Sequence, residues 1–217
     1  MRMMNKLNKR LQGLYAITDV NLMGEQLLEM SKQAILGGIH ILQYRNKTAT
    51  LQQQENEALA LAHLCKKHHV LFLINDNIDL ALKVNADGVH LGQTDTQLLR
   101  AREKLGQEKI IGITCHNKIE LAITAQEQGA DYVAFGRFYT SHTKPTAPPA
   151  DISILSNAKQ SINIPIVAVG GITIKTAPDL LEQDADMLAV INAIFGEKDV
   201  MAATQQFVDF FPSGIHL

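Results

Sequence analysis

Cysteine is scarce in this chain of 217 residues, which contains only Cys65 and Cys115. Cys65 falls in an expected helix and Cys115 at the end of an expected strand, so the two support neither a disulfide framework nor a cysteine-based zinc site. We therefore expect a protein of the reducing cytoplasm. The sequence also has no obvious nucleophile, base and carboxylate triad, so covalent catalysis by a side chain is not indicated.

Long apolar runs and blocks of like charge are also missing. No stretch approaches the roughly 20 apolar residues that a membrane-crossing helix needs. The basic start of the chain leads into a polar segment rather than the apolar core of a signal peptide, and we expect residues 1–12 to be a flexible lead-in. Lysine and arginine number 20 against 22 aspartates and glutamates, a formal net charge of -2. These features argue against membrane insertion and against general nucleic-acid binding.

The chain has instead a regular alternation of short apolar runs and longer amphipathic stretches. The apolar runs predict eight strands, at residues 14–18, 39–44, 70–74, 88–91, 110–114, 132–136, 166–169 and 187–191. Helical stretches such as 24–36 and 51–69 lie between them. Repeated strand and helix units of this kind are typical of α/β proteins with a parallel sheet.

Eight such units in one short chain predict a single domain over residues 1–217, a (β/α)8 or TIM barrel of parallel strands with an outer ring of helices. A doubly wound open sheet has the same alternation, but no G-x-G-x-x-G motif follows the first strand. In a barrel, active sites lie where the strands end and the following loops begin. The proline-rich loop 139–150 follows the sixth strand, and its length indicates a functional loop that closes as a lid.

Cationic side chains follow the second strand. In an extended backbone Gln43, Arg45 and Lys47 project to one side, because side chains alternate with a period of two. The planar fork of an arginine and the compact charge of a lysine suit a pyrophosphate. A solvated strand end would carry the same residues, so this segment alone leaves both interpretations open.

Two carboxylates end the neighbouring third and fourth strands. Asp76 and Asp95 would lie close enough in a barrel to share Mg²⁺, with waters and phosphate oxygens completing its coordination. Each would also serve as a helix N-cap, and spacing alone does not separate the two roles. His90, on the fourth strand, is either a general base or a hydrogen-bonded interior residue.

The loops after the last three strands carry phosphate-binding features. Residues 136–144 place hydroxyl groups beside Lys144, and Gly170 and Gly171 follow the seventh strand. Glycines expose backbone N–H groups, and the loops after strands seven and eight are the usual phosphate site of barrels. A tight turn would also require glycine.

The order of these segments resembles thiamine phosphate synthases. The resemblance runs from Gly13 to Phe195 and rests on Gln-x-Arg-x-Lys (43–47), Asn-Asp (75–76), His-Leu-Gly-Gln-x-Asp (90–95), Thr-Lys (143–144) and Val-Gly-Gly-Ile (169–172). It implies a transferase with Mg²⁺ as cofactor that joins two small molecules. These are 4-amino-2-methyl-5-hydroxymethylpyrimidine diphosphate and 4-methyl-5-(2-hydroxyethyl)thiazole phosphate, and the products are thiamine phosphate and pyrophosphate.

The resemblance also implies residue roles. Catalysis falls to Arg45, Lys47 and Lys144, and the metal to Asp76 and Asp95. Substrate binding falls to Gln43, Arg45, Asn46, Lys47, Asn75, Thr114, Ser141, His142, Thr143, Lys144, Gly171, Ile191 and Asn192. Within that set the resemblance implies that the pyrimidine diphosphate is held by Gln43, Arg45, Lys47, Asn75, Thr114 and Lys144. The thiazole phosphate would be surrounded by Ser141, His142, Thr143, Gly171, Ile191 and Asn192. This chain departs from the commoner family pattern at Asn46, where glutamate is usual, and at Thr114, Ser141 and Asn192.

Two alternatives share the expected fold. A thiazole tautomerase would move a proton with His90, His116 or His142 as base, whereas a non-catalytic barrel would bind thiamine precursors without turnover. A Mg²⁺ requirement and pyrophosphate release separate the synthase from the tautomerase, and turnover itself separates either enzyme from a binding protein. The sequence indicates no oligomeric state.

Overall fold

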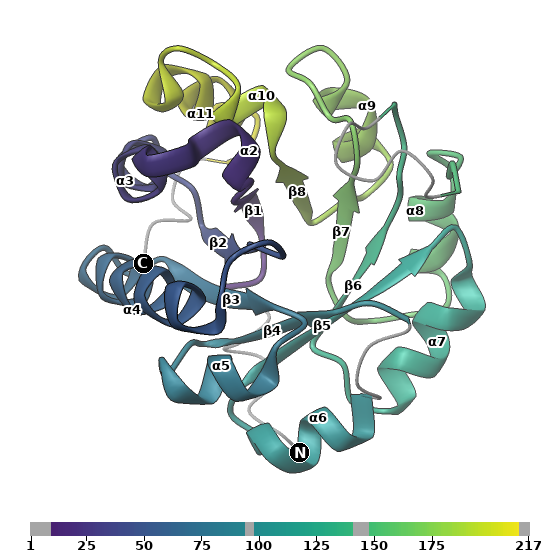
Figure 1. Cartoon of the computed structure of the whole chain (residues 1–217). Coiled ribbons are helices and arrows are strands. Elements are labelled where there is room, and N and C mark those ends of the chain that lie inside the picture. The colour runs from purple at the N-terminus through teal and green to yellow at the C-terminus, as the bar shows by residue number, and fades with distance from the viewer. Residues whose placement is uncertain (1–9, 94–97, 141–147, 213–217) are drawn as a thin grey trace.

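The computed structural model describes residues 10–93, 98–140 and 148–212. Eight parallel strands close into a barrel in chain order, with β1 paired to β8, and Figure 1 shows them at the centre of a ring of helices. The strands are β1 (Gly13–Ile17), β2 (Ile41–Tyr44), β3 (Leu71–Asn75), β4 (Gly88–Leu91), β5 (Ile110–His116), β6 (Tyr132–Phe135), β7 (Ile166–Val169) and β8 (Met187–Val190). The predicted barrel is therefore confirmed, and each predicted strand ends within about two residues of the observed one.

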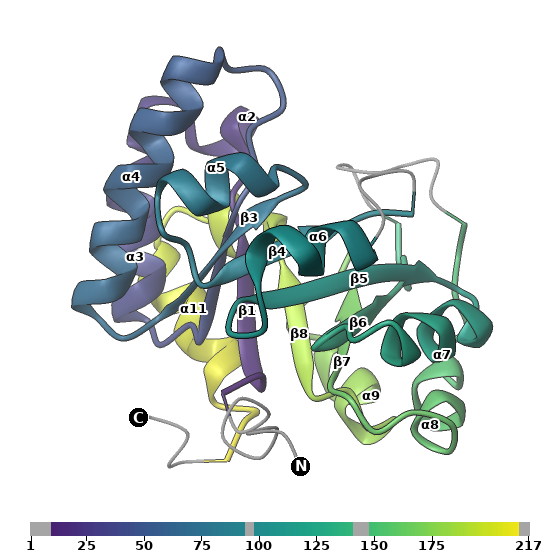
Figure 2. The same ribbon diagram turned by 90° about the horizontal axis from the view of Figure 1, so that it is seen from below.

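The helices between the strands are short, apart from one. They are α2 (Val20–Met23), the 3-10 turn η1 (Gly24–Gln26), α3 (Leu27–Leu36), α4 (Leu51–Lys67), α5 (Ile78–Lys83), α6 (Leu98–Leu105), α7 (Ile119–Glu127), α8 (Ile154–Lys159), α9 (Ala177–Glu182), α10 (Asn192–Phe195) and α11 (Val200–Val208). Figures 1 and 2 agree that α3, α4 and α11 lie on one flank of the barrel and α7 and α8 on another. Within the described ranges, every helix is too short or too polar to cross a bilayer.

The long helix α4 shows why these segments become helices. Its N-cap Thr50 accepts a hydrogen bond from the backbone N–H of Gln53, at 3.2 Å, which satisfies a donor that has no partner inside the helix. Ala58, Leu61 and Cys65 are its buried residues, and their spacing of three and four positions forms one apolar face against the barrel. The remaining residues are mostly polar and form part of the outer surface, where Leu51 and Leu59 are also exposed.

Two layers of apolar side chains stabilise the barrel, because neighbouring residues of a strand point to opposite faces. Leu14 and Ala16 of β1 pack outward against the helices, whereas Tyr15 and Ile17 pack in the interior. Leu11 joins the interior layer and is only 1% exposed. The lead-in expected over residues 1–12 is therefore packed at Leu11, while residues 1–9 lie outside the described part.

Two tyrosine rings of the barrel interior meet edge to face. The ring centroids of Tyr15 and Tyr132 are 6.2 Å apart, with an interplanar angle of 76°. The ring of Tyr132 lies against Gly112 of β5, where an added Cβ would come within 1.9 Å of the ring carbon Cζ. Only a glycine at position 112 leaves room for the Tyr132 ring. This ring lies in the barrel interior beneath the carboxyl ends of the strands.

An ion pair ties together the elements around β5. Arg102 of α6 is 8% exposed, and its guanidinium lies 2.6 Å from the carboxylate of Asp131. The same carboxylate accepts a hydrogen bond from the backbone N–H of Ile111, at 2.8 Å, and Arg102 also donates to the carbonyl groups of Gly106 and Gly129. These glycines follow α6 and α7 with positive φ angles of 72° and 90°, as expected of residues that end helices.

Candidate active site

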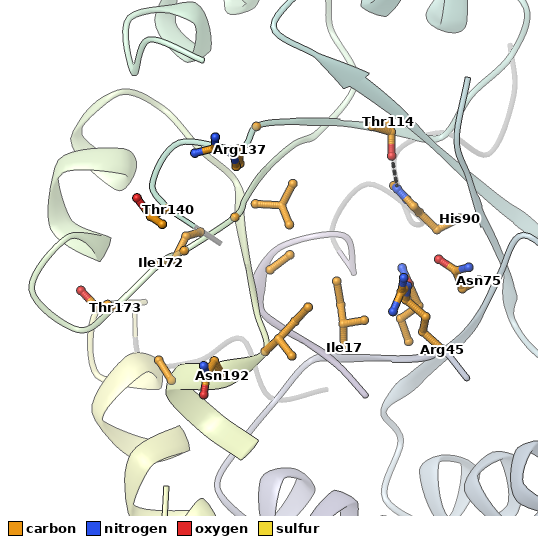
Figure 3. A pocket seen from close by; sticks show the side chains of 18 of the residues that line it. Ile17, Arg45, Asn75, His90, Thr114, Arg137, Thr140, Ile172, Thr173 and Asn192 are labelled. Carbon is orange, nitrogen blue, oxygen red and sulfur yellow. Dashed lines mark hydrogen bonds between the residues drawn. The ribbon is translucent and has the colours of Figure 1, made fainter. Parts of the chain in front are cut away.

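A pocket of about 430 Å³ opens at the carboxyl ends of the strands, and each strand or the loop after it contributes to its lining. Figure 3 shows two groups of side chains across it. Arg45, Asn75, His90 and Thr114, from strands β2 to β5, lie on one side, whereas Arg137, Thr140, Ile172, Thr173 and Asn192 lie on the other. Ile17 lies between the two groups, so polar regions face each other across an apolar middle.

Arg45 is the principal cation of the first side. Its backbone N–H donates to the hydroxyl of Thr18, at 2.9 Å, and the hydroxyl donates to the Arg45 carbonyl, at 3.3 Å. Its Nε is buried, and no described residue accepts a hydrogen bond from it. Leaving such a donor without a partner costs about 1–3 kcal/mol. An anion bound in the pocket would remove that cost.

Lys47 and Asp76 meet at the rim. The Lys47 ammonium lies 2.8 Å from Oδ2 of Asp76, and the same oxygen accepts a hydrogen bond from the amide of Asn75, at 2.7 Å. Asp76 does not cap the next helix, because Asn77 does so by accepting from the backbone N–H of Leu80. Of the two roles that the sequence left open for Asp76, the N-cap is therefore wrong, and the role as a metal ligand stays a prediction.

Asn46 lies between these cations but has a different environment. Its Nδ2 donates to Glu57, at 3.0 Å, and its Oδ1 accepts from the backbone N–H groups of Thr48 and Ala49. Asn46 is 8% exposed and does not line the pocket. The side chain of Asn46 thus stabilises the loop that contains Lys47. The predicted contact of Asn46 with substrate has no support in this geometry.

Gln43 and Thr114 line the pocket and are connected through the barrel floor. Gln43 Nε2 donates to Tyr15 Oη, at 2.5 Å, and Tyr15 Oη lies 3.0 Å from Tyr132 Oη. His90 joins the other end, with Nδ1 2.9 Å from Tyr132 Oη and Nε2 2.9 Å from Thr114 Oγ1. Both ring nitrogens of His90 are therefore engaged, which favours the interior interpretation of this residue over that of a general base.

The second side is built from closely packed backbone. Gly170 and Gly171 have positive φ angles of 104° and 68°, and Gly170 accepts from the backbone N–H of Tyr139, at 3.0 Å. A Cβ added at Gly171 would lie 2.4 Å from the carbonyl oxygen of Thr140. The loop after β7 thus packs directly on the segment after β6, an approach that only glycine permits. Ile191 and Asn192, after β8, complete this side.

The remaining predicted site residues are Asp95, Ser141, His142, Thr143 and Lys144, and they lie outside the described residues. The structure brings Gln43, Arg45, Asn75, Thr114, Gly171, Ile191 and Asn192 together around the pocket. Lys47 and Asp76 stand beside them at the rim. Within the described residues no group of three or more histidine, cysteine, aspartate and glutamate side chains forms a metal site.

His116, one of the candidate bases, lines the pocket, as do several residues that were not singled out as site residues from the sequence. Arg137, directly after β6, adds a second arginine to the pocket, and Thr140, Thr173 and Glu197 add polar groups on the same side. Position supplied a usable signal for Arg137, because it follows the end of a strand just as Arg45 does. Glu197 has no such signal, since it lies beyond the short helix α10.

A closed parallel barrel with an arginine on each side of its carboxyl-end pocket and glycine backbone on one of them is typical of TIM-barrel enzymes that bind phosphorylated small molecules. The comparisons agree. A family model described as thiamine monophosphate synthase matches residues 14–194. A thiamine-phosphate synthase of Alcanivorax borkumensis is 50% identical over 194 residues, which cover 89% of each chain.

Two further relatives support the same assignment. A thiamine-phosphate synthase of Nitrosospira multiformis is 47% identical over 94% of this chain and 87% of the relative. The solved thiamine phosphate pyrophosphorylase of Pyrococcus furiosus superposes with a TM-score of 0.85 at 34% identity, over 93% of this chain and 95% of the other. The chain belongs to the thiamine monophosphate synthase family, so the transferase family expected from the sequence is confirmed.

Proposed function

We propose that the pocket condenses 4-amino-2-methyl-5-hydroxymethylpyrimidine diphosphate with 4-methyl-5-(2-hydroxyethyl)thiazole phosphate to give thiamine phosphate and pyrophosphate. The observation that carries this proposal is Arg45, which lines the pocket and whose buried Nε has no acceptor among the described residues. Lys47 and Asp76 lie at the rim nearby. Such an arrangement suits a diphosphate, whose oxygens accept from the guanidinium and the ammonium together.

Mg²⁺ fits the donor set at this end of the pocket. The Asp76 carboxylate offers hard oxygen atoms at the rim, which Mg²⁺ prefers, and the ion usually takes only one or two carboxylates besides substrate phosphates and waters. Asp76 would hold it together with Asp95, whose role is proposed from the sequence. When bound, Mg²⁺ neutralises part of the charge on the leaving diphosphate.

The opposite side suits the thiazole phosphate. Gly170 and Gly171 lack side chains that would cover the backbone, and Asn192 begins the short helix α10 next to them. Backbone N–H groups of such loops bind phosphate in TIM barrels. We assign Gly171, Ile191 and Asn192 to this substrate. Ser141, His142 and Thr143 keep the same assignment from the sequence.

The proposed reaction proceeds by loss of the leaving group. The bond between the pyrimidine methylene carbon and the diphosphate oxygen breaks, and the oxygen keeps the electron pair. Arg45 and Lys47, with Lys144 assigned from the sequence, stabilise this developing negative charge. The thiazole nitrogen then donates its lone pair to the cation-like carbon, and Ile17 and Ile191 keep water away from that carbon.

No protein nucleophile is required for this reaction. Both cysteines are free and buried, and burial raises the pKa of the Cys115 thiol to about 12, so neither is present as a reactive thiolate. Unpaired thiols also suit the reducing cytoplasm, which we propose as the compartment. Both ring nitrogens of His90 are engaged, so a tautomerase reaction would have to use His116, which also lines the pocket, or His142 as its base.

The direct test is to mix the purified protein with both phosphorylated precursors, with and without Mg²⁺, and to measure thiamine phosphate and pyrophosphate. We expect both products in equal amounts, and only with the metal. Isomerisation of the thiazole without pyrophosphate release would instead identify a tautomerase. Absence of turnover at saturating substrate and metal would overturn the proposed function.

A further inference from the structure

The hydrogen bonds beneath the pocket join two residues that we assign to the same substrate. They run from Gln43 through Tyr15, Tyr132 and His90 to Thr114. Tyr15 is 1% exposed and Tyr132 is 0% exposed. Their hydroxyl groups therefore have no access to bulk water. The hydrogen-bonded residues from Gln43 to Thr114 must supply one another's donors and acceptors.

With the amide nitrogen of Gln43 placed on Tyr15, counting the protons gives the direction of every other bond. Gln43 Nε2 donates to Tyr15 Oη, so the single Tyr15 proton is directed to Tyr132 Oη, its other partner. The Tyr132 proton is then directed to Nδ1 of His90. His90 must therefore be the neutral tautomer that carries its proton on Nε2. Burial raises the pKa of both tyrosine hydroxyls, which keeps their protons in place.

Gln43 and Thr114, at the two ends of this series of hydrogen bonds, present opposite groups to the pocket. Nε2–H of His90 donates to Thr114 Oγ1, so the proton of Thr114 is available to a ligand. Gln43 uses its amide nitrogen on Tyr15, so its amide oxygen is available to accept. The pocket thus has the amide oxygen of Gln43 from β2 as an acceptor and the hydroxyl of Thr114 from β5 as a donor, and both residues line it.

We propose that Tyr15, Tyr132 and His90 are positioning residues that set which of Gln43 and Thr114 donates and which accepts. The pocket then selects a heteroaromatic ring edge with a donor beside an acceptor, as on the 4-aminopyrimidine. Its exocyclic amine would donate to Gln43, and a ring nitrogen would accept from Thr114. This inference rests on the proposed function, because it names how the pyrimidine substrate of that reaction is recognised.

This series of hydrogen bonds also couples the orientation of Gln43 to that of Thr114. Turning the Gln43 amide by half a rotation would present its oxygen to Tyr15, and every bond along the chain would then have to reverse. Thr114 would then donate its proton to His90, and Gln43 would present its amide nitrogen to the pocket in place of its amide oxygen. The pocket accordingly has one polarity at a time, and removal of either tyrosine hydroxyl uncouples the two ends without changing a residue that lines the pocket.

The first test measures the histidine itself and needs no turnover. Nitrogen-15 NMR of the histidine-labelled protein distinguishes the two neutral tautomers and the imidazolium, and a His90→Gln variant identifies the signal among the eight histidines of the chain. We expect a neutral ring with its proton on Nε2 near pH 7. A proton on Nδ1, or a doubly protonated ring, would overturn the proposed direction of these hydrogen bonds.

The second test uses kinetics with Tyr15→Phe and Tyr132→Phe. Each removes one buried hydroxyl and keeps the ring. We expect the KM for the pyrimidine diphosphate to rise about tenfold, because a ring-edge hydrogen bond loses its fixed partner, while the KM for the thiazole phosphate stays unchanged. Thr204→Val is the matched control, since Thr204 is also 0% exposed and its hydroxyl donates to Val200 in α11, away from the pocket.

The outcomes separate the two proposals. The positioning role of Tyr15 and Tyr132 is wrong if both Tyr→Phe variants change the KM values for the two substrates equally. It is also wrong if both variants behave as Thr204→Val does. Either result leaves the proposed enzyme activity intact. If the unmodified protein forms no thiamine phosphate, the proposed function fails, while the tautomer measurement still decides whether the chain exists. Thermal unfolding monitored by circular dichroism confirms that each variant is folded before its kinetics are compared.

Discussion

The ammonium nitrogen of Lys47 lies 2.8 Å from a carboxylate oxygen of Asp76. The Lys47 side chain is 55% exposed and that of Asp76 26%, so water screens their attraction, and such pairs contribute about 0–1 kcal/mol to folding. A pair so weak is readily opened. In the proposed reaction, Lys47 would transfer to the diphosphate and Asp76 to Mg²⁺ at little energetic cost.

Asp76→Asn is therefore expected to affect metal use far more than stability. The Mg²⁺ concentration for half-maximal rate should rise more than about tenfold, because an amide is a poorer ligand for a hard cation. Asp79→Asn is the control, since Asp79 forms a comparable exposed pair with Lys104 on the outer helices, at 2.9 Å. Equal metal dependence in the two variants would remove Asp76 from the metal site.

Arg45 is expected to act through its fork of donors as well as its charge. Arg45→Ala should lower kcat by about 10²–10³, as removal of a group that stabilises a developing anion does, and Arg45→Lys should restore only part of that loss. Steady-state assays with pyrophosphate detection measure both. Arg100→Ala, on the outer helix α6, is the control. The sequence predicts the same loss for Lys144→Ala. Turnover near normal in Arg45→Ala would contradict the leaving-group role.

Gly171→Ala is expected to weaken thiazole phosphate binding. The added methyl group would lie 2.4 Å from the Thr140 carbonyl oxygen, at a φ of +68°. Gly106→Ala is a matched control, because Gly106 has a φ of +72° and nothing within 4 Å of the added carbon. Both variants should lose about 1–2 kcal/mol of stability from the strained backbone. Only Gly171→Ala should raise the KM for the thiazole phosphate, and equal KM values would contradict the assignment.

Asp131→Ala is expected to destabilise the barrel without altering its chemistry. It would leave Arg102 buried and uncompensated, which costs about 3–5 kcal/mol. Urea unfolding should show a lower midpoint, while kcat of the folded protein should be unchanged because Asp131 does not line the pocket. Asp79→Ala, at the exposed pair, should cost less than about 1 kcal/mol. Similar losses in the two variants would show that burial does not set the strength of the Arg102 pair.

The barrel and most of one side of the pocket were predictable, because they depend on periodicity. Apolar runs located all eight strands, and the period of two placed Gln43 and Arg45 on one face at the end of β2. Strand ends of a barrel share one rim, so residues far apart in sequence could be grouped. Asn75 and Thr114 entered the predicted site through the family resemblance, and the structure places both in the pocket.

Interactions between distant residues were not predictable from local patterns. Asn46 stands between two cations in sequence, yet Glu57 of the next helix holds its amide. Tyr15 and Tyr132 fit ordinary strand positions, and nothing near either one indicates that their hydroxyls meet across 117 residues. The pairing of His90 with Tyr132 is equally invisible, because it depends on how the closed barrel brings strand interiors together.

Gly112 carries no functional group and touches no proposed ligand, yet a methyl group there would lie 1.9 Å from the ring of Tyr132. Its single hydrogen atom is what leaves room for the ring, and the ring carries the hydroxyl that joins His90 to Tyr15. In a saturation mutagenesis screen for growth without added thiamine, position 112 should tolerate substitution as poorly as Arg45 does. Substitutions at Gly112 would thus impair substrate recognition although this residue does not contact the substrate.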